Sequence, residues 1–166
     1  MNITLANIND LIQIIETIKM CISDLGKKGI YQWNENYPTE KIIQNDIENN
    51  NLYIIKDNCQ IISLMTINEV QEKEWETINW SLKNTKPLCI HRLIIHPSWQ
   101  KKGLGREFLK FAIEFAHNNK NDSIRFDAYS GNPELITTYT KSGCKKRGEV
   151  FFPFREMPFY CFEMDL

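Results

Sequence analysis

The sequence lacks a surplus of charge of either sign, a long apolar run and a secretion signal. Its 20 basic and 21 acidic residues give a net charge of −1, whereas proteins that bind nucleic acid generally carry a strong positive excess. No apolar run approaches the ~20 residues that span a membrane, and the first ten residues lack the apolar stretch of a signal peptide. We therefore expect a cytoplasmic protein that binds neither nucleic acid nor a membrane.

Patterns typical of metal sites are also missing. No Cys-x-x-Cys pair occurs among the five cysteines, and the three histidines form no His-x-x-x-His pair. Apolar residues flank Cys21, Cys89 and Cys161, and we expect no metal and five small, buried, reduced side chains. The cysteines are Cys21, Cys59, Cys89, Cys144 and Cys161.

The pattern of apolar residues predicts a single α/β domain. The chain has 166 residues, which is the size of one domain. Helical periodicity and capping residues predict four helices, at 10–26, 39–49, 103–115 and 132–143. Short apolar runs predict strands at 52–55, 61–67, 88–95, 124–128, 144–152 and 159–164. We expect a mixed sheet with helices on both faces.

Between two of these strands, residues 68–86 are polar and rich in glutamate. We expect a long loop there, with strand character near Trp75 and Trp80. Large aromatic side chains are seldom exposed without a function. These two tryptophans are therefore expected to cover an acceptor site or a subunit interface.

The most informative segment has glycines and basic residues between a predicted strand and a predicted helix. Glycine lets the backbone approach a ligand closely, and N–H groups at a helix start bind phosphate. The segment lacks GxxxxGK[ST] and GxGxxG, so neither a P-loop nor a dinucleotide fingerprint is predicted. It satisfies [QR]-x-x-G-x-[GA] and reads Gln100, Lys101, Lys102, Gly103, Leu104, Gly105 and Arg106.

Two segments resemble the GCN5-related N-acetyltransferase (GNAT) superfamily. Residues 91–106, HRLIIHPSWQKKGLGR, are similar to its strand, His-Pro turn and diphosphate loop. Residues 132–144, NPELITTYTKSGC, are similar to its later signature, with Asn132 and Tyr139 seven positions apart. Cys144 departs from the pattern, because phenylalanine is usual there.

This resemblance implies a fold and a co-substrate. The fold is a single acyl-CoA N-acyltransferase domain over residues 1–166, whose mixed, mostly antiparallel sheet is splayed at the cofactor site between strands 88–95 and 123–128. Acetyl-CoA would place its diphosphate on residues 100–106. Its pantetheine arm would lie along the strand that holds Leu93, Ile94 and Ile95, and Asn132 would contact it near the thiol.

The resemblance also suggests catalytic groups. Tyr139 falls at the family's usual proton donor for the departing thiolate, and a backbone N–H near Leu93 would polarise the thioester carbonyl. His91 is a candidate base because imidazole exchanges protons near neutral pH, although it could equally be a strand residue that faces solvent or packs on its neighbours. Glu69 and Glu72 are alternative bases, or members of a solvated acidic run.

We expect an enzyme that acetylates a primary amine, with a small cationic amine slightly favoured over a peptide N-terminus or lysine. Trp33 and Tyr37 either line the amine pocket or close the core beside the second helix. The alternative is a non-catalytic acyl-CoA-binding sensor. A homodimer is a further hypothesis, in which the C-terminal strands pair across the dimer rather than finish the sheet within one chain.

Overall fold

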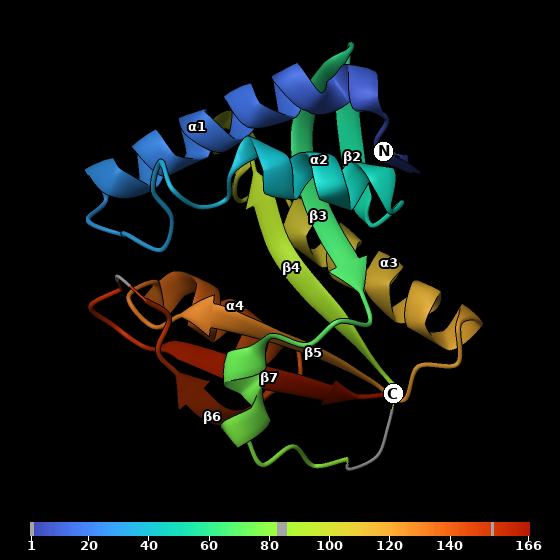
Figure 1. The fold of residues 1–166 in the computed structure, drawn as a ribbon, viewed down its shortest axis with the longest axis vertical. Helices are drawn as coiled ribbons and strands as arrows, with labels where there is room; N and C mark the ends of the chain where they lie inside the picture. Colours follow the sequence, from blue (N-terminus) through green and yellow to red (C-terminus); the bar gives the residue numbers. More distant parts are fainter. Residues whose placement is uncertain (1, 83–85, 154) are drawn as a thin grey trace. The chain divides into compact units, whose positions relative to one another are not determined.

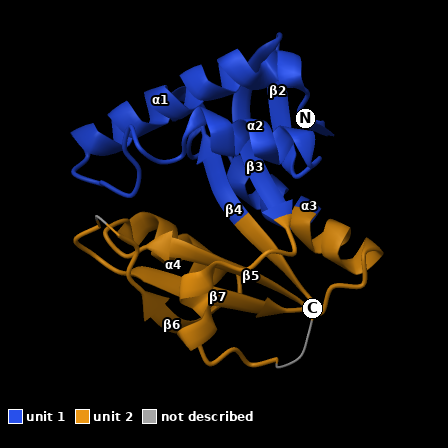
Figure 2. Cartoon of the chain, in the orientation of Figure 1, with its two compact units in different colours: residues 1–67, 91–111 blue, residues 68–90, 112–166 orange. Residues whose placement is uncertain are grey.

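The seven strands of the described chain form one sheet in the order β1-β2-β3-β4-β5-β7-β6 (Figure 1). This computed structural model describes residues 2–82, 86–153 and 155–166. The chain divides into two compact units, which Figure 2 colours separately. Unit 1 holds residues 1–67 and 91–111, and unit 2 holds residues 68–90 and 112–166. Strand β4 and helix α3 each begin in one unit and end in the other.

Unit 1 contains a hairpin flanked by a short strand and two helices. Strand β2 pairs antiparallel with both β1 and β3, and a tight turn joins β2 to β3. The whole elements of unit 1 are β1 (Ile3–Leu5), α1 (Leu11–Lys27), α2 (Glu40–Glu48) and β2 (Leu52–Asp57), and most of β3 (Gln60–Asn68) also belongs to it. The unit also takes the second half of β4 (Pro87–Ile95) and the first half of α3 (Leu104–Asn118).

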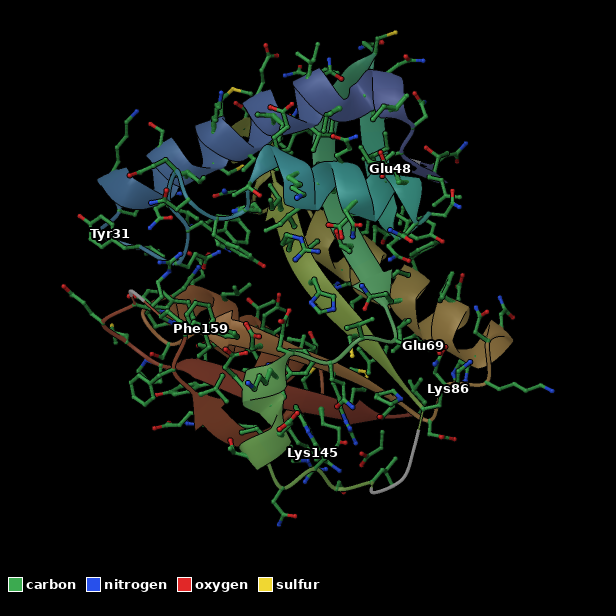
Figure 3. All side chains as sticks on the ribbon, in the orientation of Figure 1. Tyr31, Glu48, Glu69, Lys86, Lys145 and Phe159 are labelled. Carbon is green, nitrogen blue, oxygen red and sulfur yellow. The ribbon has the colours of Figure 1, made fainter. Side chains whose placement is uncertain are left out.

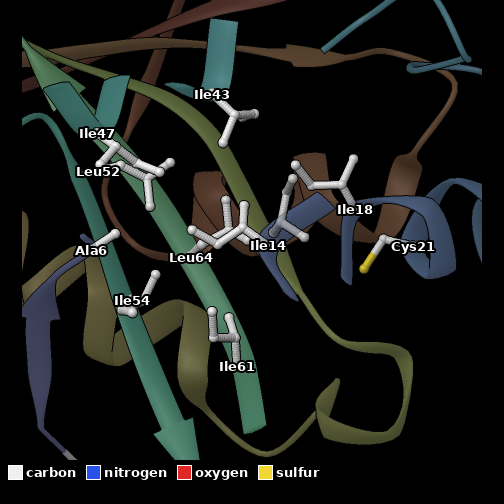
Figure 4. Packing of buried hydrophobic residues seen from close by; sticks show 11 residues of the cluster. Ala6, Ile14, Ile18, Cys21, Ile43, Ile47, Leu52, Ile54, Ile61 and Leu64 are labelled. Carbon is white, nitrogen blue, oxygen red and sulfur yellow. The ribbon is translucent and has the colours of Figure 1, made fainter. Parts of the chain in front are cut away.

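The core of unit 1 lies between the helices and one face of the hairpin (Figure 4). Ile14 of α1 and Ile43 of α2 meet Leu52 of β2 in this cluster. On the opposite face of β2, the ring of Tyr53 lies 4.8 Å from that of Phe111 in α3. Because side chains alternate along a strand, unit 1 has helices on both faces of its strands, as predicted.

Unit 2 is built around β5, which has a partner strand on each side. Strand β4 pairs with it in parallel over Pro87–Cys89, and β7 pairs with it antiparallel along its length. Strand β6 in turn pairs antiparallel with β7. The remaining elements are β5 (Ser123–Tyr129), α4 (Pro133–Lys141), β6 (Lys145–Val150) and β7 (Phe159–Asp165). The C-terminal strands thus finish the sheet within the chain, while the predicted separation of β4 from β5 stays a prediction.

The structure corrects the sequence-based expectations at several places. Strand β1 was not expected, and residues near Trp75 form a 3-10 turn, Lys73–Thr77, instead of a strand. Residues 83–85 of that predicted loop lie outside the described residues. Cys59 is exposed in the β2–β3 turn, so burial is right for four cysteines and wrong for this one. The four helices, the hairpin and the mixed, mostly antiparallel α/β architecture are confirmed, and the third helix extends beyond its predicted apolar stripe to Asn118.

Candidate active site

A tight turn leads from β4 into α3 and contains the predicted phosphate-binding residues. Lys101 and Gly103 both have left-handed backbone, with φ of 62° and 88°. The carbonyl of Gly103 accepts the N–H groups of Arg106 and Glu107, at 3.0 and 3.1 Å, which starts the helix. The N–H groups of Leu104 and Gly105 precede these bonds, so they belong to the part of a helix that has no acceptor within the helix itself.

The space over this turn is open where side chains are missing. A Cβ built on Gly103 would meet nothing within 4 Å, and one on Gly105 would lie 3.6 Å from Cδ1 of Ile95, which is ordinary contact. Lys101, Lys102 and Arg106 are all exposed around it. Main-chain donors, room for a ligand and positive charge therefore coincide at one place.

Neighbouring elements hold the start of the turn. The Oε1 of Gln100 accepts from Nζ of Lys28 at 3.2 Å, and its Nε2 donates to the carbonyl of Ile95 at 3.4 Å. The ammonium group of Lys102 lies 4.4 Å from the ring centre of Trp99, a cation–π distance. Gln100 is therefore bonded to Lys28, the C-cap of α1, and to the end of β4.

Strand β4 holds the residues predicted to bind the pantetheine arm. Ile94 is buried, whereas Leu93 and Ile95 are only half-buried. The carbonyl of Ile94 accepts from Oγ of Ser63 at 2.7 Å, and the carbonyl of Ile95 accepts from Sγ of Cys21 at 3.2 Å. The predicted base, His91, is buried in the same strand.

Arg92, in the same strand, was not among the residues predicted from the sequence, and its side chain is buried. Its Nε and one terminal nitrogen donate to Oδ2 of Asp46, at 3.1 and 2.6 Å. The other terminal nitrogen donates to the hydroxyl of Tyr37 at 3.0 Å. Burial alone would lower the pKa of Arg92, but Tyr37 and Asp46 outweigh it and raise that pKa, so the guanidinium keeps its charge.

The two predicted acceptor-binding residues have different surroundings. Trp33 is half-buried and packs against the hydrophobic core of unit 1, one of its two predicted roles. Tyr37 is half-buried and exchanges two backbone hydrogen bonds with Asn34, at 3.1 and 3.2 Å. The hydroxyl of Tyr37 contacts Arg92, so both ends of this residue are held.

In unit 2, Asn132 and Tyr139 lie at the start and near the end of α4. The side chain of Asn132 caps the helix by accepting from the N–H of Leu135 at 3.2 Å, as predicted. The ring of Tyr139 lies 4.5 Å from that of Phe126 on β5. Burial, with smaller effects from Cys144 and Asp127, raises the pKa of the Tyr139 hydroxyl above its ordinary value of 10.0. This phenol therefore holds its proton at neutral pH.

In the acidic segment after β3, Glu69 forms an ion pair, whereas Glu72 and Glu76 line a cavity. Glu69 accepts from Nζ of Lys86 at 2.7 Å (Figure 3) and from Nδ2 of Asn121 at 3.1 Å. The hydrogen bond from Lys86 lowers the pKa of Glu69, which makes it a weaker base than an unpaired glutamate. As an alternative base Glu69 is thus less suited than the sequence suggested.

A cavity of about 260 Å³ lies beside the same segment. The rings of Trp75 and Trp80 meet edge to face in its wall, with centres 5.8 Å apart. The guanidinium of Arg125 lies 4.6 Å from the ring of Trp80 and pairs with the fully buried Glu163 at 3.0 Å. The lining residues are Gln71, Glu72, Lys73, Trp75, Glu76, Trp80 and Arg125.

Each unit brings together its own share of the predicted site residues. Unit 1 holds residues 100–106, the end of β4, His91 and the Tyr37 loop, whereas Asn132 and Tyr139 belong to unit 2. Among the described residues, no three His, Cys, Asp or Glu side chains group as metal ligands would. No helix in that part of the chain is long and apolar enough to cross a membrane.

Known proteins resemble this chain along most of its length. The model of the Acetyltransferase (GNAT) family matches residues 17–144. An acetyltransferase of the GNAT family from Streptococcus agalactiae superposes with a TM-score of 0.82 at 21% identity, covering 99% of this chain and 95% of that one. The ribosomal-protein-alanine N-acetyltransferase from Brucella melitensis superposes with a TM-score of 0.73 at 16% identity, covering all of both chains. At these identities the two structures demonstrate a shared fold.

A shorter match joins the chain to a curated protein. Over 68 residues it is 36% identical to the UPF0157 protein YqkA of Bacillus subtilis. The matched stretch is 41% of this chain and 19% of YqkA. The chain thus corresponds to a minor part of that longer protein.

Proposed function

Because the chain belongs to the Acetyltransferase (GNAT) family, we propose that it transfers the acetyl group of acetyl-CoA to a primary amine, within one domain that spans residues 1–166. The observation that carries the proposal is the turn into α3, where Gly103 is exposed and left-handed. N–H groups at a helix start bind phosphate, and the exposed Lys101, Lys102 and Arg106 add positive potential.

The residues of this turn fit the diphosphate of acetyl-CoA. A Cβ at Gly103 would occupy open space, and one at Gly105 would lie 3.6 Å from Cδ1 of Ile95. Residues 100–106 would hold the diphosphate, and backbone groups of Leu93–Ile95 would hold the pantetheine arm. Asn132 would contact it near the thiol, and the bound thioester supplies an activated acetyl group.

Three groups of the chain would then serve the transfer. A backbone N–H at Leu93 would polarise the thioester carbonyl. His91 would accept the proton that the attacking amine loses. Tyr139 would donate a proton to the sulfur as it leaves, since its hydroxyl is protonated at neutral pH.

A small cationic amine is the acceptor that the cavity of unit 2 favours. Its wall contains the half-buried ring of Trp80 and the carboxylates of Glu72 and Glu76, together with the cations Lys73 and Arg125. Aromatic faces attract organic cations, and carboxylates form charge-assisted hydrogen bonds with ammonium groups. A volume of about 260 Å³ suits a small molecule better than a folded protein surface.

The test is a thiol-release assay with acetyl-CoA and a panel of amines. The panel holds a polyamine, an aminoglycoside, a peptide with a free N-terminus and a lysine peptide with a blocked N-terminus. We expect release above background with at least one amine, and the highest kcat/KM with a small cationic one. If acetyl-CoA binds in calorimetry but no amine releases thiol, the protein is an acyl-CoA sensor.

Neutral variants of the cavity test the acceptor class. Glu72→Gln and Glu76→Gln should raise the KM for a cationic amine while leaving the acetyl-CoA Kd unchanged. Glu74→Gln is the matched control, since Glu74 lies in the same 3-10 turn but not in the cavity lining. Equal KM values for all three variants would place the acceptor elsewhere.

A further inference from the structure

Arg92 has a backbone conformation that is rare within a strand. Its φ is 46°, in the left-handed region, although it lies inside β4. Non-glycine residues in this region are uncommon, and they interrupt a regular ladder as a bulge does. The φ of Arg92 sets how the peptide groups on its two sides are oriented, and one of them carries the N–H of Leu93.

Bonds to β3 hold the part of β4 that follows Arg92. The carbonyl of Ile94 accepts from the side chain of Ser63 at 2.7 Å. At the end of the strand, the N–H of His96 donates to the carbonyl of Ile62 at 2.9 Å. The left-handed residue lies two positions before the Ile94 carbonyl, so β3 fixes the segment that carries the N–H of Leu93.

The side chain of Arg92 holds this segment to α2 and to the Tyr37 loop, and through Asp46 also to β3. Asp46, on α2, accepts two of its N–H groups, and Tyr37 accepts a third. The same Oδ2 of Asp46 also accepts from Oγ1 of Thr66 on β3, at 2.9 Å. The side chains of Arg92 and Asp46 are only 8% and 5% exposed, so water does not compete for these bonds.

A contribution to stability alone does not explain this arrangement. Replacing a buried ion pair by apolar side chains of similar size is often neutral or stabilising, because burying two charges is costly. Such a pair does fix geometry, since the planar guanidinium offers its donors in a rigid fork. Strained backbone that persists because its surroundings hold it is typical of functional sites.

We propose that Arg92 is a positioning residue for acetyl transfer: with Asp46 and Tyr37, it holds the β4 backbone so that the N–H of Leu93 polarises the thioester carbonyl. This inference rests on the proposed function.

An apolar replacement of the network separates positioning from stability. The variant Arg92→Met, Asp46→Leu, Thr66→Val removes both charges and the hydroxyl that would otherwise lose its partner. We expect it to unfold at nearly the wild-type temperature and to bind acetyl-CoA with an unchanged Kd, since residues 100–106 are intact. Its kcat should fall about 100-fold, the usual effect of a small displacement of a catalytic group.

Two single variants cover the case in which the triple variant does not fold. Tyr37→Phe removes one hydroxyl and keeps the ion pair, and Arg92→Lys keeps the charge but not the fork. Both should lower kcat with little change in the melting temperature. Tyr53→Phe is the matched control, since it removes a phenol hydroxyl elsewhere in unit 1, and it should leave kcat unchanged.

Infrared spectroscopy of bound acetyl-CoA measures how strongly the thioester carbonyl is polarised. The acetyl carbonyl is labelled with ¹³C so that its band can be identified, and no acceptor amine is needed. In the wild type this band should lie below that of free acetyl-CoA, and in the folded variants it should return toward the free value. A band equally shifted in wild type and variants overturns the proposal for Arg92. A wild type that shifts the band but acetylates no amine overturns only the proposed function.

Discussion

Tyr139 is the residue whose substitution tests the proposed chemistry most directly, because it is the proposed proton donor. Because burial raises the pKa of its hydroxyl, the proton is present throughout the neutral range. We predict that Tyr139→Phe lowers kcat by about 100-fold or more, as general acids contribute ~10²–10⁴-fold. The acetyl-CoA Kd, measured by calorimetry, should not change.

A second tyrosine in unit 2 provides the comparison. Tyr160 lies on β7, where its ring contacts the ammonium group of Lys146 at 3.2 Å. Tyr160→Phe should leave kcat at the wild-type value. If the two variants have the same kcat, Tyr139 is a packing residue and another group, or water, protonates the thiolate.

Candidate site residues can be proposed from the sequence only where the signal is local. The spacing of Asn132 and Tyr139 and the glycines near residue 103 lie within short segments. Arg92 could not be found in this way, because Asp46 is 46 positions away and belongs to a helix. Arg125 in β5 is a similar case, since its buried ion-pair partner, Glu163, is 38 positions away. Long-range polar pairs leave no periodic trace in a sequence.

At the scale of elements, one substitution in the first turn of α3 can distinguish the effect of a side chain on acetyl-CoA binding from its effect on helix stability. We predict that Gly105→Ala stabilises the fold or leaves it unchanged, because alanine favours helix by about 1 kcal/mol over glycine and its Cβ would meet only Ile95, at 3.6 Å. The same methyl group would stand where the diphosphate needs the backbone. The acetyl-CoA Kd should therefore rise by about tenfold, or 1.4 kcal/mol.

Gly26→Ala is the control for this variant. Gly26 lies in α1, and a Cβ there would meet nothing within 4 Å. We expect a similar gain in thermal stability and an unchanged Kd. Should Gly105→Ala bind acetyl-CoA as tightly as the wild type, the diphosphate is not held at this turn.

The cap of α4 offers a second test at this scale. Asn132→Ala should cost about 1 kcal/mol of stability, whereas Asn132→Ser should cost little, because serine is also a good cap. If Asn132 also contacts acetyl-CoA, the serine variant keeps its melting temperature but binds acetyl-CoA more weakly. Thermal melts and calorimetry on the two variants distinguish a cap alone from a cap that binds ligand.

Most elements were predictable because their apolar residues repeat with a clear period. Strand β1 has three residues, two of them exposed, and so shows no alternation to detect. Near Trp75, the aromatic residues suggested a strand, but the indole N–H of Trp75 donates to Asp127 at 3.0 Å from a 3-10 turn. There a tertiary contact outweighs local preference.

For the whole molecule, four buried thiols predict a loss of stability in alkali. Burial raises the pKa of Cys21, Cys89 and Cys161 from 9.0 to about 12, and that of Cys144 to about 11. Above pH 9 the unfolded chain releases these protons and the folded chain retains them. Stability is therefore complete below pH 9 and falls as pH rises, by about 1.4 kcal/mol per pH unit for each thiol.

Urea unfolding at pH 7, 8, 9 and 10 measures this loss. At pH 8 a thiol reagent should label Cys59 alone in the folded protein, because the other four are buried, and all five in urea. The variant Cys59→Ser should reproduce the wild-type dependence on pH. A free energy of unfolding that is constant to pH 10 would contradict the burial of these thiols.

The two edge strands of the sheet, β1 and β6, limit how this chain can associate with further copies of itself. Strand β1 spans three residues, and β6 presents Lys145 and Lys146 to solvent. A register shift follows Lys146, and Arg147 turns to Glu163 at 2.8 Å. Short, charged and irregular border strands discourage the addition of a foreign strand. A homodimer would therefore have to associate through helices or loops. At high protein concentration, fibrils should not form by pairing of these edge strands.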